Sequence, residues 1–184
     1  RITRWLSPDG TEKAWTYEVG AKSEWFDNRL RANVTLFYLI DKQFQSPSAF
    51  VDAIGATQFI TRNDADFENQ GIELELQAVP IDGLNLYASA GYQDSKYKNI
   101  AANTLAQQAE CLNLRATNQV FSSRCGAGII TAQGGIADPV RTPEITLAAG
   151  GSYDIRIGER WTLTPAINVV HQGDAETAAA NLTF

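Results

Sequence analysis

The sequence predicts an all-β fold, an antiparallel up-and-down transmembrane β-barrel of which about six strands (three hairpins) are present. Apolar and polar residues alternate one by one along six segments, which places one kind on each face of a strand. The connections between these segments are alternately short and long. No Asp, Glu, Lys or Arg falls on any of the six apolar faces. This combination is typical of a barrel wall with tight turns on one side of a membrane and long loops on the other.

The first hairpin covers residues 15–41. From Trp15 to Trp25, aromatic and aliphatic residues alternate with polar ones, and the same pattern runs from Leu30 to Ile40. The polar tripeptide 27–29, Asp-Asn-Arg, separates the two segments and predicts a tight turn.

Two further hairpins follow. The stretch GIELELQA, residues 71–78, sets Ile, Leu, Leu and Ala against Glu, Glu and Gln, and its strand extends back toward residue 59. A turn at 80–83 leads to the alternating segment 84–93. The third hairpin joins residues 144–155 to 161–170 through a turn near 158–160.

Two connections, residues 42–66 and 95–140, are predicted to be long loops, with a short helix at 101–109. Compact soluble domains rarely carry structureless loops of more than about 15 residues. Two such loops on one edge of a sheet therefore favour the barrel.

Aromatic side chains gather at the strand ends. Trp25 and Trp161 lie beside short turns, whereas Tyr38 and Tyr92 lie near the long loops. Rings at both ends of an apolar band form the girdles of a membrane barrel. The alternative is edge packing in a soluble, secreted β-sandwich that acts as a binding module.

The polar strand faces are expected to point into a water-filled lumen. The candidate lumen-facing residues are Glu18, Lys22, Glu24, Arg31, Glu73 and Glu75. Glu73 and Glu75 could be mistaken for a glycosidase pair, but alternating carboxylates on a wet strand face explain them more economically.

Composition narrows the function classes. The chain has 184 residues, a net charge of -6 and a pI of about 4.8, which argues against nucleic-acid binding through basic patches. It holds no apolar run long enough for a transmembrane helix. His171 is the only histidine, so no His-based metal cluster is expected, and no metal site or cofactor is predicted.

The second long connection holds the candidate ligand-binding and disulfide residues. Cys111 and Cys125 are predicted to form a disulfide in an oxidising compartment, with two free thiols as the alternative. Arginine pairs with carboxylate or catecholate oxygens, and aromatic rings stack on flat ligands. The candidate substrate-binding residues are Tyr97, Arg115, Phe121 and Arg124. The alternative for each of them is a solvated loop position.

Several segments resemble the barrel of TonB-dependent outer-membrane receptors. The stretch from Glu12 to Gln45 contains a strand with Tyr17, Glu18, Gly20 and Lys22, a turn with Asn28-Arg29-Leu30, and a strand with Asn33, Thr35, Phe37 and Tyr38. Residues 69–97 resemble the following hairpin, and Arg141-Thr142-Pro143 before an alternating strand is also similar.

The resemblance implies active uptake across the bacterial outer membrane. Members bind a scarce nutrient, such as a ferric siderophore, and release it inward with energy from the TonB complex acting on a plug domain. The resemblance thus implies outer-membrane lipid, the ligand and the TonB complex as partners, and no enzymatic activity. Residues 1–184 are expected to be part of the barrel domain, with the plug, the TonB box and the remaining strands outside the chain. A passive porin-like channel is the alternative transport reading.

Overall fold

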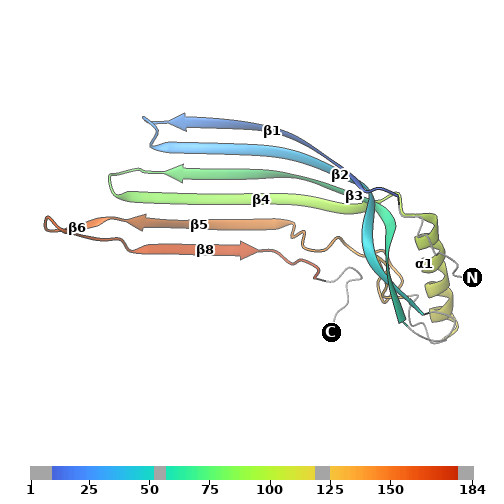
Figure 1. Ribbon diagram of the computed structural model, residues 1–184. Coiled ribbons are helices and arrows are strands. Elements are labelled where there is room, and N and C mark those ends of the chain that lie inside the picture. Colours follow the sequence, from blue (N-terminus) through green and yellow to red (C-terminus); the bar gives the residue numbers. More distant parts are fainter. Residues whose placement is uncertain (1–9, 52–56, 119–124, 178–184) are drawn as a thin grey trace, which may run out of the picture.

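The computed structural model describes residues 10–51, 57–118 and 125–177 and contains one extended antiparallel sheet (Figure 1). Its strand order is β1-β2-β3-β4-β5-β8. The strands are β1 (Lys13–Trp25), β2 (Leu30–Val51), β3 (Thr57–Ala78), β4 (Leu84–Lys98), β5 (Ile145–Tyr153) and β8 (Ala166–Gln172). Each strand pairs with its neighbour along the chain, so the predicted up-and-down order of six strands is confirmed.

The strand register confirms the predicted faces. Val34 pairs with Leu74, Leu74 with Ala90, and Ala90 with Leu147, so one row of apolar side chains runs across four strands. The adjacent row on the other face is polar and includes Asn33 opposite Glu75. We call this six-stranded sheet the wall, and its two sides the apolar face and the polar face.

The short turns of the first two hairpins rely on left-handed backbone. Residues 26–28 have φ values between 54° and 65°, and the N–H of Arg29 closes the turn on the carbonyl of Phe26 at 3.1 Å. In the second turn Gly83 has φ of 85°, a conformation that glycine adopts without a steric penalty.

The third hairpin departs from the prediction, because both of its arms are broken. A separate two-stranded sheet, β6 (Ile155–Ile157) and β7 (Trp161–Leu163), forms its tip. The N–H of Asp154 makes the last bond between this arm and the preceding hairpin, to the carbonyl of Gly83 at 2.9 Å, one step beyond the pair Leu84 and Tyr153. Pro165, which interrupts the other arm between β7 and β8, has no N–H to donate. The tip therefore leaves the wall at the short-turn end.

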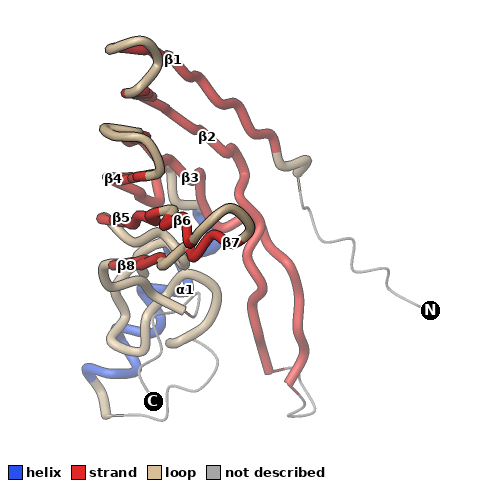
Figure 2. Tube along the Cα trace, turned by 90° about the vertical axis from the view of Figure 1, so that its left-hand side faces the viewer, coloured by secondary structure: helices blue, strands red, loops and turns tan. Residues whose placement is uncertain are grey.

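The long loop predicted at residues 42–66 is wrong, whereas the predicted extension of the third strand back toward residue 59 is confirmed. β2 and β3 continue together through it as a two-stranded ribbon, formed by residues 42–51 and 57–66. The ribbon turns away from the wall at a pair of register shifts, one between Asp41 and Phe44 and one between Phe44 and Gln45 (Figure 2). Gln43 has φ of 59° at this point. Pro47 is tolerated because β2 has a free edge there among the described residues.

The helix is longer than predicted. The helix α1 spans Ala102–Ala116, whereas the sequence predicts 101–109. It starts beside the base of the ribbon, from which the two diverge (Figure 2). Among the described residues, no helix has the length and apolar character needed to cross a membrane.

The small buried core lies outside the wall, between α1 and residues 125–143. Ile129, Ile130 and Cys111 have no exposed surface. Burying a side chain such as isoleucine stabilises a fold by about 1.5–3 kcal/mol. We call α1 together with residues 125–143 the cap. The wall itself, by contrast, leaves its apolar face open.

Candidate functional site

The polar face is held together by cross-strand polar contacts. Arg31 and Glu24 form an ion pair at 2.7 Å, and the side-chain amide of Asn33 donates to Glu75 at 3.2 Å. Nearer the cap, Asn69 donates to Gln93 at 2.9 Å. These contacts link polar side chains across neighbouring strands, so this face is a connected polar surface.

An aromatic cluster lies on the polar face at its cap end. The ring centroids of Phe44, Phe67 and Tyr97 are 5.6 to 6.3 Å apart, with tilted planes. These distances lie within the range of favourable aromatic pairs. All three rings are partly exposed, so they present apolar surface that a flat ligand could cover.

Strand pairing and the bulge together assemble this cluster. Phe67 and Tyr97 are directly paired across β3 and β4. Phe44 would belong to the apolar face by simple alternation from Ile40, but the register shift after Asp41 moves it to the polar face. Without the bulge, the cluster would lack its third ring.

Carboxyl groups surround the base of the cluster. Asp41 pairs with Phe67 in the register, just beyond the end of the apolar face. Burial raises the pKa of Asp41 to about 6, helped by the hydrogen bond that its protonated carboxyl donates to Glu12 and by the negative charges of Glu12 and Asp66. A ligand at this cluster therefore meets an acidic neighbourhood.

The phenol of Tyr97 stays protonated at neutral pH. Burial, followed by the charge of Asp64, raises the pKa of Tyr97 to about 12. Because the hydroxyl remains neutral, it can donate a hydrogen bond to an oxygen of a ligand. Tyr97 thus combines an aromatic face with a polar group.

A buried carboxylate anchors the cap beside the cluster. Asp64 has no exposed surface, and its Oδ1 accepts hydrogen bonds from Thr104 Oγ1 at 2.7 Å and from Arg62 at 2.9 Å. Ser46 donates to its Oδ2. The carbonyl of Asp64 also accepts the N–H of Ala101 at 2.9 Å. One residue therefore joins β2, β3 and the start of α1.

Cross-links close the cap farther along α1. Cys111 and Cys125 are joined by a disulfide bond, with Cα atoms 5.1 Å apart. The amide of Gln108 donates to the carbonyl of Gly134 at 2.9 Å, and Arg115 donates to the carbonyl of Ala132 at 2.9 Å. The helix and residues 125–143 thus form one packed unit.

The structure brings together only part of the predicted ligand-binding set. Tyr97 lies in the aromatic cluster, although on β4 and not in a loop. Arg115 lies in the last turn of α1, about 16 Å along the helix from Thr104 at 1.5 Å per residue. Its guanidinium is directed to Ala132. Phe121 and Arg124 fall outside the described residues.

Sequence reasoning missed Phe44, Phe67 and Asp41 as site residues. Phe67 has the same strand parity as Glu73 and Glu75, so extending that alternation would have placed it on the polar face. Phe44 carries no such signal, because its position depends on the bulge. Within the described ranges, no group of three or more His, Cys, Asp and Glu residues could hold a metal ion.

The fold and its surfaces define the class of protein. An up-and-down sheet with a continuous apolar face, aromatic residues at both ends of that face, and a polar opposite face is part of the wall of a transmembrane β-barrel. The six strands do not close a barrel.

The family follows from comparison with known proteins. A model of the family described as "TonB dependent receptor-like, beta-barrel" matches residues 6–183, and the chain belongs to this family of bacterial outer-membrane proteins. The soluble β-sandwich is therefore not supported. The described residues also place no second sheet over the apolar face.

Two solved structures show the same fold. The ferric yersiniabactin uptake receptor FyuA from Yersinia pestis is 16% identical, with a TM-score of 0.60. BauA, the ferric preacinetobactin receptor from Acinetobacter baumannii, is 17% identical, with a TM-score of 0.55. In both cases the match covers 92% of this chain and 20% of the solved one, so the chain spans about a fifth of their length.

Proposed function

We propose that this chain is part of the barrel domain of an active outer-membrane transporter that takes up a scarce nutrient, a ferric siderophore, with energy from the TonB complex. The plug domain that would contact TonB, and the strands that would close the barrel beside β1 and β8, would lie outside these 184 residues. The single observation that carries the proposal is the aromatic cluster at the cap end of the polar face.

In this proposal the apolar face meets lipid and the polar face lines the lumen. The stretch from Leu30 to Ile40 covers ten strand steps, about 33 Å of chain at 3.3 Å per residue. A strand tilt of about 40° reduces this to a height of roughly 25 Å, the height of the apolar band of outer-membrane barrels. The six charged residues predicted for the lumen, Glu18, Lys22, Glu24, Arg31, Glu73 and Glu75, all have the strand parity of the polar face.

The chemistry of the cluster narrows the ligand. Three rings favour a flat, partly apolar molecule, and the Tyr97 hydroxyl can donate to one of its oxygens. The nearby carboxyl groups of Asp41, Glu12 and Asp66 would repel a strongly anionic complex. We therefore expect a ferric complex with little or no net negative charge.

The test uses the full-length receptor and its closest matched variants. Tyr97→Ala removes one ring of the cluster, whereas Tyr87→Ala removes a tyrosine from the same face near the short turns, where its hydroxyl bonds Asn168 at 2.9 Å. Loss of one aromatic contact between the Tyr97 ring and the ligand, worth about 0.5–1.5 kcal/mol, predicts a roughly 2- to 13-fold weaker Kd for Tyr97→Ala. Equal affinities of the two variants for every ferric complex tested would refute the site.

Energy dependence separates a transporter from a passive porin-like channel. Uptake of radioactive iron complex by intact cells is measured with and without a protonophore, which removes the proton gradient of the inner membrane. An active transporter should stop accumulating ligand when the gradient is lost. Uptake that continues unchanged would favour the channel.

A further inference from the structure

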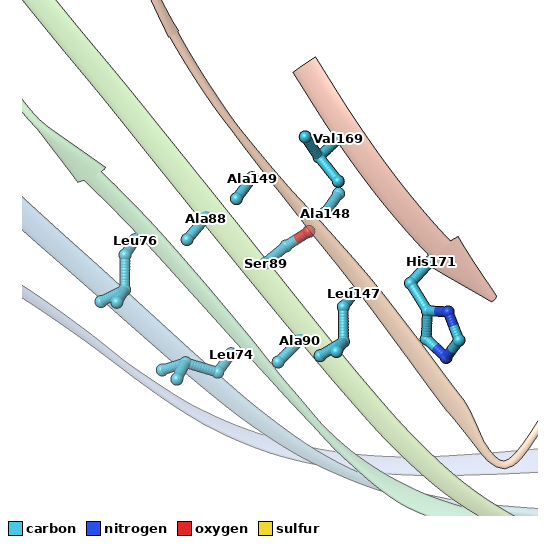
Figure 3. A pocket seen from close by; sticks show the side chains of 10 residues that line it. All are labelled: Leu74, Leu76, Ala88, Ser89, Ala90, Leu147, Ala148, Ala149, Val169 and His171. Atoms are coloured by element: carbon cyan, nitrogen blue, oxygen red, sulfur yellow. The ribbon is translucent and has the colours of Figure 1, made fainter. Parts of the chain in front are cut away.

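The backbone ladder places the side chains in the middle of the wall, but it is interrupted at the base of the ribbon. In the regular part, Leu74, Ala90 and Leu147 are paired across three strands and line one apolar hollow (Figure 3). At the base of the ribbon, residues 42–43 of β2 lie opposite the single residue Asp66 of β3. The aromatic cluster lies at this interruption, so the ladder alone does not place its rings.

Hydrogen bonds of the Asp66 side chain replace the missing part of the ladder. The Oδ1 atom of Asp66 accepts the backbone N–H of Gln43 at 2.9 Å, and its Oδ2 atom accepts the side-chain amide of Asn99 at 2.8 Å. Hydrogen bonds to a carboxylate are among the stronger ones in proteins. One carboxylate on β3 therefore joins β2 to the segment that follows β4.

Each of the three bonded residues lies next to one ring of the aromatic cluster, or two positions from it. The pairs are Gln43 with Phe44, Asp66 with Phe67, and Asn99 with Tyr97. The ring centroids are only 5.6 to 6.3 Å apart, so a shift of one backbone segment would change the contacts between the rings. The bonds of Asp66 thus connect the three backbones that carry the cluster.

The backbone of Gln43 is held in an uncommon conformation. Its φ of 59° is rare for a residue with a side chain, and such a conformation persists only where the surroundings enforce it. Side chains of β3 do so here, because Asp66 accepts the N–H of Gln43 and Asn63 donates to its carbonyl. Relaxation of Gln43 would undo the bulge that brings Phe44 to the polar face.

We propose that Asp66 is the positioning residue of the aromatic cluster, whose carboxylate holds the three rings in the arrangement that receives a ligand. Asp66 acts through the backbones of its neighbours and not through contact with the ligand. The inference rests on the proposed function, in which the cluster binds a ferric complex. It requires an acceptor oxygen at position 66 and not the negative charge itself, because the acceptor makes the bond to Gln43.

The first test observes one ring directly and needs no ligand. In the full-length receptor in detergent, para-fluorophenylalanine is placed at position 44 and its fluorine resonance is recorded. The neighbouring rings shift this resonance away from its value in urea-unfolded protein. Asp66→Ala should move it most of the way toward that value. Asp66→Asn, which keeps an acceptor oxygen, should leave it near the wild-type position.

Glu68→Ala is the matched control, because it removes a carboxylate two residues along the same strand. The fluorine resonance of this variant should stay near the wild-type position. An unmoved resonance in Asp66→Ala would overturn the inference. Equal movement in Glu68→Ala would overturn it too, since loss of negative charge would then be the cause.

The second test separates positioning from a general loss of stability. Kd is measured for the uncharged complex of Fe³⁺ with three hydroxyquinolines, a probe built of flat aromatic ligands. Phe44→Ala should weaken binding roughly 2- to 13-fold, the worth of one aromatic contact. Asp66→Ala should also weaken it, but the double variant should lose less than the product of the two single losses, because both changes act on the same ring.

The outcomes distinguish this inference from the proposed function. Single losses that multiply in the double variant would overturn the role of Asp66. A Kd that Phe44→Ala leaves unchanged would overturn the ligand site of the proposed function, whereas the fluorine resonance would still decide on Asp66.

A second variant covers the case in which Asp66→Ala does not assemble, which the heat-dependent gel shift of each variant shows. Glycine adopts the φ of 46° found at Asn99 without a steric penalty. Asn99→Gly therefore removes the bond to the Oδ2 atom of Asp66 and leaves the backbone unstrained. It should move the fluorine resonance in the same direction, and an unmoved resonance would contradict the proposal.

Discussion

Replacing Leu74 by Arg tests which solvent the apolar face meets. Leu74 lies four strand steps from the short-turn end of this face and six from the other, counted on its partner Val34 between Leu30 and Ile40. It therefore lies near the middle of an apolar band about 25 Å high. At that depth a lipid-facing arginine costs about 2–4 kcal/mol, equivalent to a roughly 30- to 900-fold shift in the folding equilibrium.

The matched control is Glu75→Gln, one residue along the same strand. The carboxylate of Glu75 accepts a hydrogen bond from Asn33 at 3.2 Å, and a glutamine carbonyl can accept the same bond. On a hydrated face such a change is expected to stay within about 0.5 kcal/mol. Both variants are made in the full-length receptor, and assembly is measured as the heat-shifted fraction in outer membranes, followed by urea unfolding in lipid vesicles.

The expected result is a large loss of assembled barrel for Leu74→Arg and near-normal behaviour for Glu75→Gln. If both variants assembled equally well, the apolar face would not be in lipid. If the glutamine variant were the more damaged one, the two faces would be exchanged and the proposed lumen residues with them.

Three further perturbations test the cap and its base. Cys111→Ser opens a disulfide between residues 14 apart, and such a disulfide is worth about 3 kcal/mol in the chain-entropy model. The amide hydrogens of residues 125–143 should then exchange faster in the variant. Unchanged exchange would count against the cap as a cross-linked unit. Asp64→Ala leaves the partly buried guanidinium of Arg62 without its ion-pair partner, at a cost of at most about 3–5 kcal/mol, the value for fully buried pairs. The helix α1 should then lose hydrogen-exchange protection while the wall keeps its heat shift, and a protected helix would contradict the anchor. The pKa of Asp41 is raised from 3.8 to about 6, so the stability that Asp41 contributes is present below pH 4 and lost as the pH rises through 6. The free energy of urea unfolding of Asp41→Asn should lack this pH dependence. Parallel plots of unfolding free energy against pH for both proteins would show that the group does not titrate as described.

The wall could be predicted from sequence because its signal is local. A strand with two different surroundings on its two faces shows alternation, and the residues from Trp15 to Trp25 and from Leu30 to Ile40 follow this pattern. Lipid on one side and water on the other enforce that pattern at every position. The short turn at 26–28 is equally local, since it is formed by residues next to one another in the chain.

The ribbon and the cap were harder to predict, because distant residues decide their structure. The bulge at Gln43 leaves no mark in the pattern, yet it moves Phe44 into the aromatic cluster. The helix α1 has no side-chain cap, and it buries Thr104, Gln107 and Cys111 in place of an apolar stripe. Its length is set by contacts with Asp64 and residues 125–143, none of which a helical period could reveal.

The candidate ligand residues likewise show which features the sequence indicates and which features depend on the fold. The sequence indicates Tyr97 as an aromatic residue of a loop, but Tyr97 belongs to the site for a different reason, its pairing with Phe67 across β3 and β4. The charge of Arg115 indicates a ligand contact, but its guanidinium donates to the carbonyl of Ala132 in the cap. Residue type alone indicated which side chains could bind a ligand, and the fold decided which of them face the same place.

The two register shifts at the base of the ribbon have a consequence for how such receptors can diverge. One extra residue in β2 near Gln43 is followed by one in β3 near Asp64, after which the strands return to their original pairing. Deleting only one of these two residues would shift the register of every later residue pair in the ribbon by one. Insertions and deletions should therefore arise as a matched pair, one in each arm. Among relatives that keep this ribbon, the chain length before its tip should change together with the length after it.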